Sequence, residues 1–131
     1  MTEQNNSKEL ASALEAEKHE SPQMLAEALR EVMLYLHDEN NNPVSLSMEL
    51  YNLGIRDEKV KDKLLLKTIE VYNHTENPEN LTLADFTKEF KKIHPFLNFD
   101  PITAYILNWI GRWQAPKIYP LAQDLMSELE N

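Results

Sequence analysis

LTLADFTKEF, residues 81–90, is the stretch that marks the start of a helix most clearly. Thr82 stands at the N-cap position and Asp85 follows three residues later, so the two side chains can form a capping box with each other's backbone amides. Leu81 and Phe86 flank this pair and can close over it as a hydrophobic staple. The stretch therefore predicts a helix that begins directly after Thr82.

The rest of the chain has the same helical character. Apolar residues recur at spacings of three and four, strand-like alternation is missing, and only two glycines interrupt the 131 residues. We expect an all-α protein, a compact bundle of five to six helices in which two tandem helix-loop-helix units precede a C-terminal helical pair. Residues 1–20 predict a mobile N-terminal tail, and residues 21–131 predict a single all-helical domain.

The first helix of this domain is expected to run from Ser21, as N-cap, to about His37, with Pro22 at the first helical position. One arc of this helix, about 100° wide, has the spacing of a core stripe. It is formed by Leu25, Leu29, Val32, Met33 and Leu36. A second apolar strip beside it is formed by Met24, Ala28 and Tyr35. The two strips together predict burial on more than one side.

Two further helices are expected before residue 75. The second is short, is capped at Ser47 and ends at Leu53, where Gly54 can adopt the left-handed conformation of a Schellman motif. Asp57 is expected to cap the third helix, which runs to about Tyr72. Its inward side is predicted to hold Val60, Leu64, Leu65, Thr68, Ile69 and Tyr72.

An internal repeat joins this region to the opening stretch. Residues 42–51, NPVSLSMELY, and residues 77–86, NPENLTLADF, share Asn-Pro-x-x-Leu-Ser/Thr at an offset of 35 residues. Recurrent capping signals and a true duplication explain this equally well. Two helix-loop-helix units at this interval resemble the EF-hand family, and the resemblance covers about residues 25–92. In a loop that starts at Asp38, the first, third, fifth and twelfth places of the calcium pattern are Asp38, Asn40, Asn42 and Glu49.

The loop departs from the calcium pattern at two places. Pro43 stands where the sharp turn requires glycine, and Ser45 stands where an apolar residue is expected. The second unit also has a proline within its loop and too few carboxylates. We therefore expect no specific calcium binding and interpret the Asn-rich stretch as a turn that leads into a helix.

Composition narrows the classes of function. A net charge of −9 repels phosphate backbones and disfavours nucleic acid as a partner. The chain has no cysteine, which removes thiol chemistry and fits a reducing compartment, so a cytoplasmic location is expected. No stretch has the apolar length of a signal peptide or a membrane span, so no membrane association is expected.

Catalytic and metal-binding signatures are missing from the sequence. No two of the four histidines have the i,i+4 spacing that places imidazoles on one helix face, and two glycines do not supply a phosphate-binding loop. We expect no enzyme, no cofactor and no metal. The predicted function is that of a small acidic adaptor, regulator or inhibitor that presents a helical surface to another protein.

Two groups of residues are predicted to contact a partner. Tyr105 and Leu107 lie in the first helix of the C-terminal pair, on either side of its expected core arc, and are predicted to face a partner. The core arc is formed by Ile102, Ile106, Trp109, Ile110 and Trp113. A lysine patch would form if the third and fourth helices pack side by side. It comprises Lys59, Lys63, Lys67, Lys88, Lys91 and Lys92, and makes nucleic-acid binding an alternative function. A degenerate EF-hand-like module without calcium is another alternative.

Overall fold

The computed structural model describes residues 2–17 and 22–130, and every regular element in these ranges is helical. The elements are α1 (Thr2–Glu17), α2 (Pro22–Tyr35), α3 (Leu46–Asn52), α4 (Val60–Asn73), η1 (Pro78–Asn80), α5 (Leu83–Ile93), α6 (Asp100–Trp113), η2 (Pro116–Ile118) and α7 (Tyr119–Glu130). The all-α class is confirmed. The described residues form seven α-helices instead of the five to six expected.

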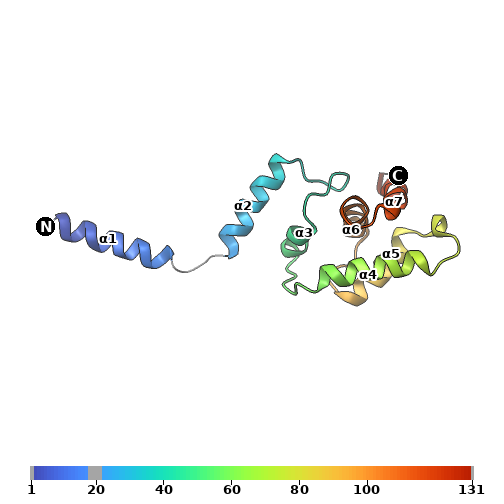
Figure 1. Cartoon of the computed structure of the whole chain (residues 1–131), viewed down its shortest axis with the longest axis horizontal. Coiled ribbons are helices and arrows are strands. Elements are labelled where there is room, and N and C mark those ends of the chain that lie inside the picture. The colour runs from blue at the N-terminus through green and yellow to red at the C-terminus, as the bar shows by residue number, and fades with distance from the viewer. Residues whose placement is uncertain (1, 18–21, 131) are drawn as a thin grey trace.

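The additional helix is α1, which occupies the segment predicted to be a mobile tail. Figure 1 shows it apart from the other helices. Its two leucines, Leu10 and Leu14, are both exposed. The segment is helical, as the structure shows, while its mobility stays a prediction. The expected N-cap at Ser21 lies outside the described residues.

Helix α6 is at the centre of the core. It packs against α3, α4, α5, α7 and η2, so several of its sides are covered (Figure 1). The residues from Ile102 to Leu107 are all buried, and Ile110 is buried as well. The core is therefore built around a helix with neighbours on several sides.

The close crossing of α6 and the start of α7 depends on one glycine. A Cβ atom at Gly111 would lie 2.7 Å from Cα of Tyr119 and 2.9 Å from its backbone nitrogen. Real Cβ atoms do not approach backbone this closely, so a side chain at residue 111 would force the two helices apart. Gly111 thus sets how closely α7 packs on α6.

Two of the expected helix boundaries are confirmed. The Asp85 amide donates to Thr82 Oγ1 at 3.3 Å, and the Thr82 amide donates to Asp85 Oδ2 at 2.9 Å, which completes the capping box. At the end of α3, Gly54 has φ of +93° and the Ile55 amide donates to the Leu50 carbonyl at 3.0 Å. This is the predicted Schellman motif.

Two other boundaries differ from expectation. The N-cap of α3 is Ser45, whose hydroxyl accepts from the Met48 amide at 3.1 Å, and not Ser47, whose hydroxyl accepts from Lys61 Nζ. Asp57 accepts from the Lys59 amide at 2.9 Å, so it caps the turn just before α4. In α3, Ser45 and Ser47 are both candidates for the N-cap, and the backbone conformation decides which of the two hydroxyls takes that role.

Candidate protein-binding surface

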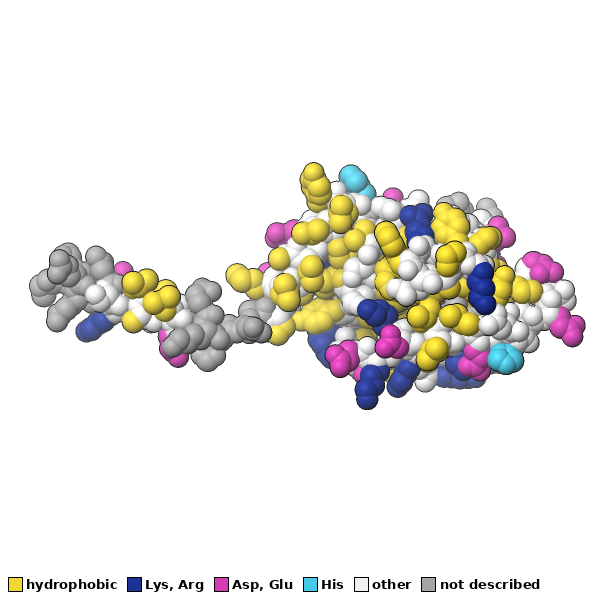
Figure 2. Space-filling model, in the orientation of Figure 1, with side chains coloured by type: hydrophobic (Ala, Val, Ile, Leu, Met, Phe, Trp, Pro, Cys, Tyr) yellow, Lys and Arg dark blue, Asp and Glu magenta, His cyan; other side chains and the backbone are white. Residues whose placement is uncertain are grey.

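Helix α2 exposes most of the apolar residues that the sequence predicts to be core. Only Ala26 and Met33 are buried, in a small cluster with Met48 of α3. Four residues of the expected core stripe are open to solvent, and we call them the α2 stripe: Leu25 (63% exposed), Leu29 (46%), Val32 (52%) and Leu36 (47%), which directly follows the last residue of α2. In Figure 2, hydrophobic side chains gather over the place that α2 occupies in Figure 1. The prediction that this stripe lines the core is therefore wrong.

The α2 stripe is exposed because few other elements pack against α2. Among its helical contacts α2 packs chiefly against α3, which has only seven residues and covers one narrow side. A signal of this was present in the sequence, because α2 carries two apolar strips and one short helix cannot cover both.

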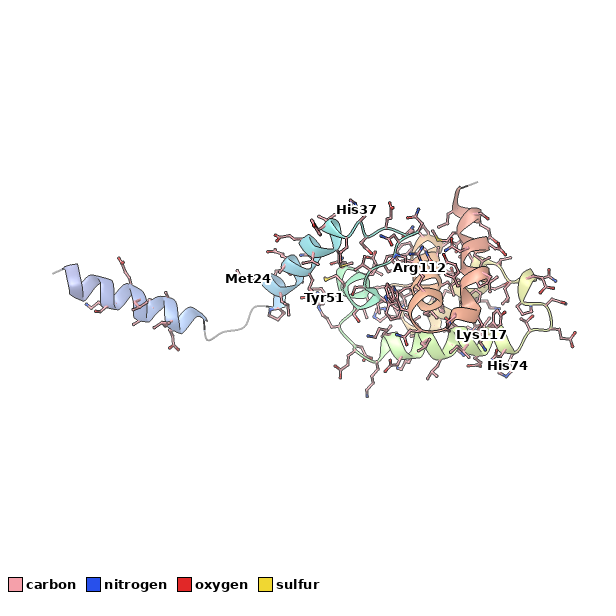
Figure 3. The ribbon with its side chains drawn as sticks, turned by 45° about the horizontal axis from the view of Figure 1, so that its top comes forward. Met24, His37, Tyr51, His74, Arg112 and Lys117 are labelled. Atoms are coloured by element: carbon pink, nitrogen blue, oxygen red, sulfur yellow. The ribbon has the colours of Figure 1, made fainter. Side chains whose placement is uncertain are left out.

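The C-terminal end of α2 is fixed by a tight turn. His37 has φ of 59°, a left-handed conformation that non-glycine residues adopt infrequently. The Asp38 amide donates to the Met33 carbonyl at 2.9 Å and the His37 amide donates to the Leu34 carbonyl at 3.0 Å. These two bonds form a second Schellman motif, and Figure 3 shows His37 where the chain leaves the helix.

The loop that follows, residues 38–45, is fastened to α6 by hydrogen bonds. Those from Asn108 Nδ2 to the Asn40 carbonyl (2.8 Å) and from Arg112 Nη2 to the Asn41 carbonyl (2.7 Å) hold its middle. Further bonds run from the Tyr105 hydroxyl to Asp38 Oδ1 (2.7 Å) and from Trp113 Nε1 to the Pro43 carbonyl (3.1 Å). The four donors are spaced so that they share one side of α6. The loop thus ties α2 to the core, although α2 itself buries little.

The pKa values of two groups close to Asp38 of this loop are raised. Burial raises the pKa of Glu49, and the negative charge of Asp38 raises it further. Burial also raises the pKa of Tyr105, as does its hydrogen bond to Asp38. The Tyr105 hydroxyl therefore stays protonated and donates a hydrogen bond to Asp38 Oδ1. The same oxygen also accepts a hydrogen bond from the Val44 amide at 2.8 Å.

A shallow apolar groove of about 260 Å³ runs between α2 and α3 beside the stripe. Leu25 and Leu29 line one wall, and Met48 and Tyr51 line the other. Figure 3 places Tyr51 on the part of α3 that lies toward α2. The Arg56 guanidinium lies 3.6 Å from the centre of the Tyr51 ring and holds this wall in place. The groove can accept an apolar side chain from a partner.

Tyr105 and Leu107, predicted to contact a partner, are instead 2% and 0% exposed. The burial contradicts that prediction, because α6 is covered on several sides and residues beside its core arc are enclosed as well. Trp113, expected in the core, is 61% exposed and lies at the end of α6. The positions of core and surface residues on this helix are thus partly exchanged.

The lysine patch has the packing that it requires, since α4 and α5 lie against each other. Lys67 pairs with Glu70 of the same helix at 3.2 Å, and Lys92 pairs with Glu89 at 3.1 Å. The remaining members, Lys59, Lys63, Lys88 and Lys91, are exposed. Nucleic-acid binding through these residues stays a prediction.

Several oxygen atoms of the Asp38 loop accept hydrogen bonds from within the protein. Asp38 accepts from Tyr105, and the carbonyls of Asn40 and Asn41 accept from α6. Within residues 2–17 and 22–130, no three His, Asp or Glu side chains are grouped so that they could hold a metal ion. The geometry explains the loop as a structural turn.

No protein-family model, curated protein or solved structure matches this chain. None of the helices in the described part of the chain is long and apolar enough to cross a membrane. Function is therefore inferred from the α2 stripe, the groove beside it and the loop that holds α2 in place.

Proposed function

We propose that this protein is a small protein-binding module, an adaptor, regulator or inhibitor, that presents the α2 stripe to another protein. The observation that carries the proposal is the exposure of four neighbouring apolar side chains on a helix that is fixed to the core. Single exposed apolar residues are common, but a contiguous apolar patch marks an interaction site. The groove beside the stripe gives a partner a place for an apolar anchor.

Hydrogen bonds that hold α2 to the core favour binding. The hydrogen bonds between the 38–45 loop and α6 hold the C-terminal end of α2, and the bond from Arg30 Nη1 to Asn52 Oδ1 (2.8 Å) joins α2 to α3. A surface that is already ordered loses less conformational entropy when it binds. The stripe is thus presented in a shape that a partner can recognise.

Crosslinking and capture from native lysate tests the proposal. The full chain is compared with the double variant Leu25→Asp/Leu29→Asp and with Leu66→Asp, which changes an equally exposed leucine on α4. We expect the natural chain and Leu66→Asp to capture the same protein, whether another protein or a copy of the chain, and the double variant to lose it. Capture that is unaffected by the double variant would show that the stripe is not the binding site. Circular dichroism checks that all three chains are folded.

Nucleic-acid binding through α4 and α5 is the alternative proposal, supported by the packing of these two helices. Phosphate contacts release counterions, so such binding weakens by orders of magnitude as salt rises from about 50 to 200 mM. Binding through the apolar α2 stripe changes little over that range. A salt titration with a labelled single-stranded oligonucleotide therefore distinguishes the two proposals.

A further inference from the structure

We infer that the partner of the α2 stripe is the α2 stripe of a second copy of this chain. The inference rests on the proposed function and names the occupant of the surface. Three features of α2 carry it: the spacing of the stripe, the absence of charge beside it, and its position on the outside of the molecule.

The spacing is that of a helix-to-helix seam. Leu25, Leu29, Val32 and Leu36 are separated by four, three and four residues, which are the intervals of the a and d positions in paired helices. Such a row stays on one side of a helix and packs into the same row on a neighbouring helix. Two copies of this stripe are therefore complementary to each other.

The positions that flank the seam are uncharged. On one side they are Ala26 and Met33, which pack toward α3, and on the other they are Ala28 and Tyr35. The charged residues of α2, which are Glu27, Arg30 and Glu31, fall at positions remote from the seam.

This pattern permits a partner of the same charge. Two copies that each carry a net charge of −9 repel one another, and charged flanks would add to that repulsion at close range. A seam designed for a basic partner would have acidic flanks, because complementary flanking charges select the partner. Neutral flanks let two acidic chains meet without burying like charges.

The seam is also accessible. At about 100° per residue, the stripe lies about a quarter of a turn around α2 from Ala26 and Met33, the side that faces α3. Figure 1 shows α2 at the edge of the group formed by α3 to α7. A second copy can therefore reach the stripe without displacing α3.

The groove enlarges the contact. A seam of two heptads is short for stable pairing, and stable interfaces bury about 800 Å² on each partner. Tyr51 is partly exposed next to the stripe, and Tyr35 is exposed on its other side. Residues on both sides of the seam thus add apolar area, and a two-fold symmetric pair uses each of them twice.

Sedimentation and light scattering of the full chain, from about 10 μM to 1 mM, test the inference. We expect a concentration-dependent dimer for the natural chain and for Leu66→Asp. Leu29→Asp/Val32→Asp should weaken the dimer by at least about 100-fold, because each aspartate would be buried against its counterpart. A natural chain that stays monomeric at 1 mM overturns the inference, as does a dimer that survives both aspartates.

Single-cysteine variants give a second readout, since the natural chain has no cysteine. Oxidation should link Leu29→Cys to itself if the helices are parallel, or to Val32→Cys if they are antiparallel. Either link should form faster than the link between two copies of Leu66→Cys. Equal rates for the α2 and α4 cysteines would overturn the inference. A monomer that still captures another protein through the stripe would refute self-association and leave the proposed function standing.

Discussion

Helices α2 and α6 have the same length and opposite surroundings. Each has 14 residues and a stripe of apolar side chains at helical spacing. Helix α6 buries nine residues, while α2 buries only Ala26 and Met33. An apolar stripe therefore predicts that a helix needs a neighbour, but not that the neighbour belongs to the same chain.

The difference arises from the other elements. Helix α6 is enclosed by α3, α4, α5 and α7, and Gly111 lets the start of α7 approach its backbone. Helix α2 has α3 on one side and is held mainly through the loop that follows it. The same kind of sequence thus gives a core helix in one place and a presented helix in the other.

Gly111→Ala should have the largest effect. The new methyl group would meet the backbone of Tyr119, which cannot rotate away as a side chain can. We expect a loss of about 3 kcal/mol or more in the free energy of unfolding, measured by urea denaturation. Ala28→Gly in α2 is the matched control and should cost about 1 kcal/mol through helix propensity alone. Equal losses would mean that α6 and α7 cross less closely than the structure shows.

The contrast between α2 and α6 is tested by truncating one residue of the α2 stripe and one core residue of α6 and comparing the two losses of stability. Ile106→Ala should lower the free energy of unfolding by about 2–5 kcal/mol, because this side chain is fully buried and leaves a cavity. Leu29→Ala should cost less than about 1 kcal/mol at concentrations where the chain is monomeric. If Leu29→Ala costs as much as Ile106→Ala, the stripe is covered within the monomer and the contrast between the helices fails.

Substitutions in the hydrogen bonds that join the 38–45 loop to α6 should have an intermediate effect on the free energy of unfolding. Asp38→Ala removes the acceptor of the Tyr105 hydroxyl and of the Val44 amide, and should cost about 2 kcal/mol. Tyr105→Phe removes only the hydroxyl and should cost about 1 kcal/mol. In a double-mutant cycle, the coupling between the two changes reports their hydrogen bond. Additive losses would show that the hydroxyl and the carboxylate do not interact.

Glu49→Gln should have the smallest effect, and the size of this effect should depend on pH. Burial and the charge of Asp38 raise the pKa of Glu49 in the folded state, so the folded protein favours the protonated form. The stabilisation from protonation is fully present below the pKa of the unfolded state and is lost as pH rises through the folded pKa. Glutamine should therefore raise the free energy of unfolding at pH 7 by at most about 1 kcal/mol, seen as a higher melting temperature, and give no gain near pH 4. An equal gain at both pH values would contradict this cause.

Local signals predicted local structure. The Thr82 capping box and the Gly54 turn depend on residues close in sequence, and both were predictable. The choice of Ser45 over Ser47 as N-cap was not, because both hydroxyls lie within reach of the start of α3. The exchange of roles between Tyr105 and the α2 stripe depends on which helices surround each segment. That arrangement involves residues far apart in the chain, which periodicity does not report.

The loop bonds also set an order of events when the chain folds. The four bonds from α6 to the loop join residues 67 to 71 positions apart, so they cannot form until α6 has taken its place. The other contacts of α2 are its small cluster with Met48 and the bond from Arg30 to Asn52, both with α3, so we expect α2 to dock after α3 to α7 have packed. We therefore expect the α2 stripe to be held in its final position only in molecules that have finished folding.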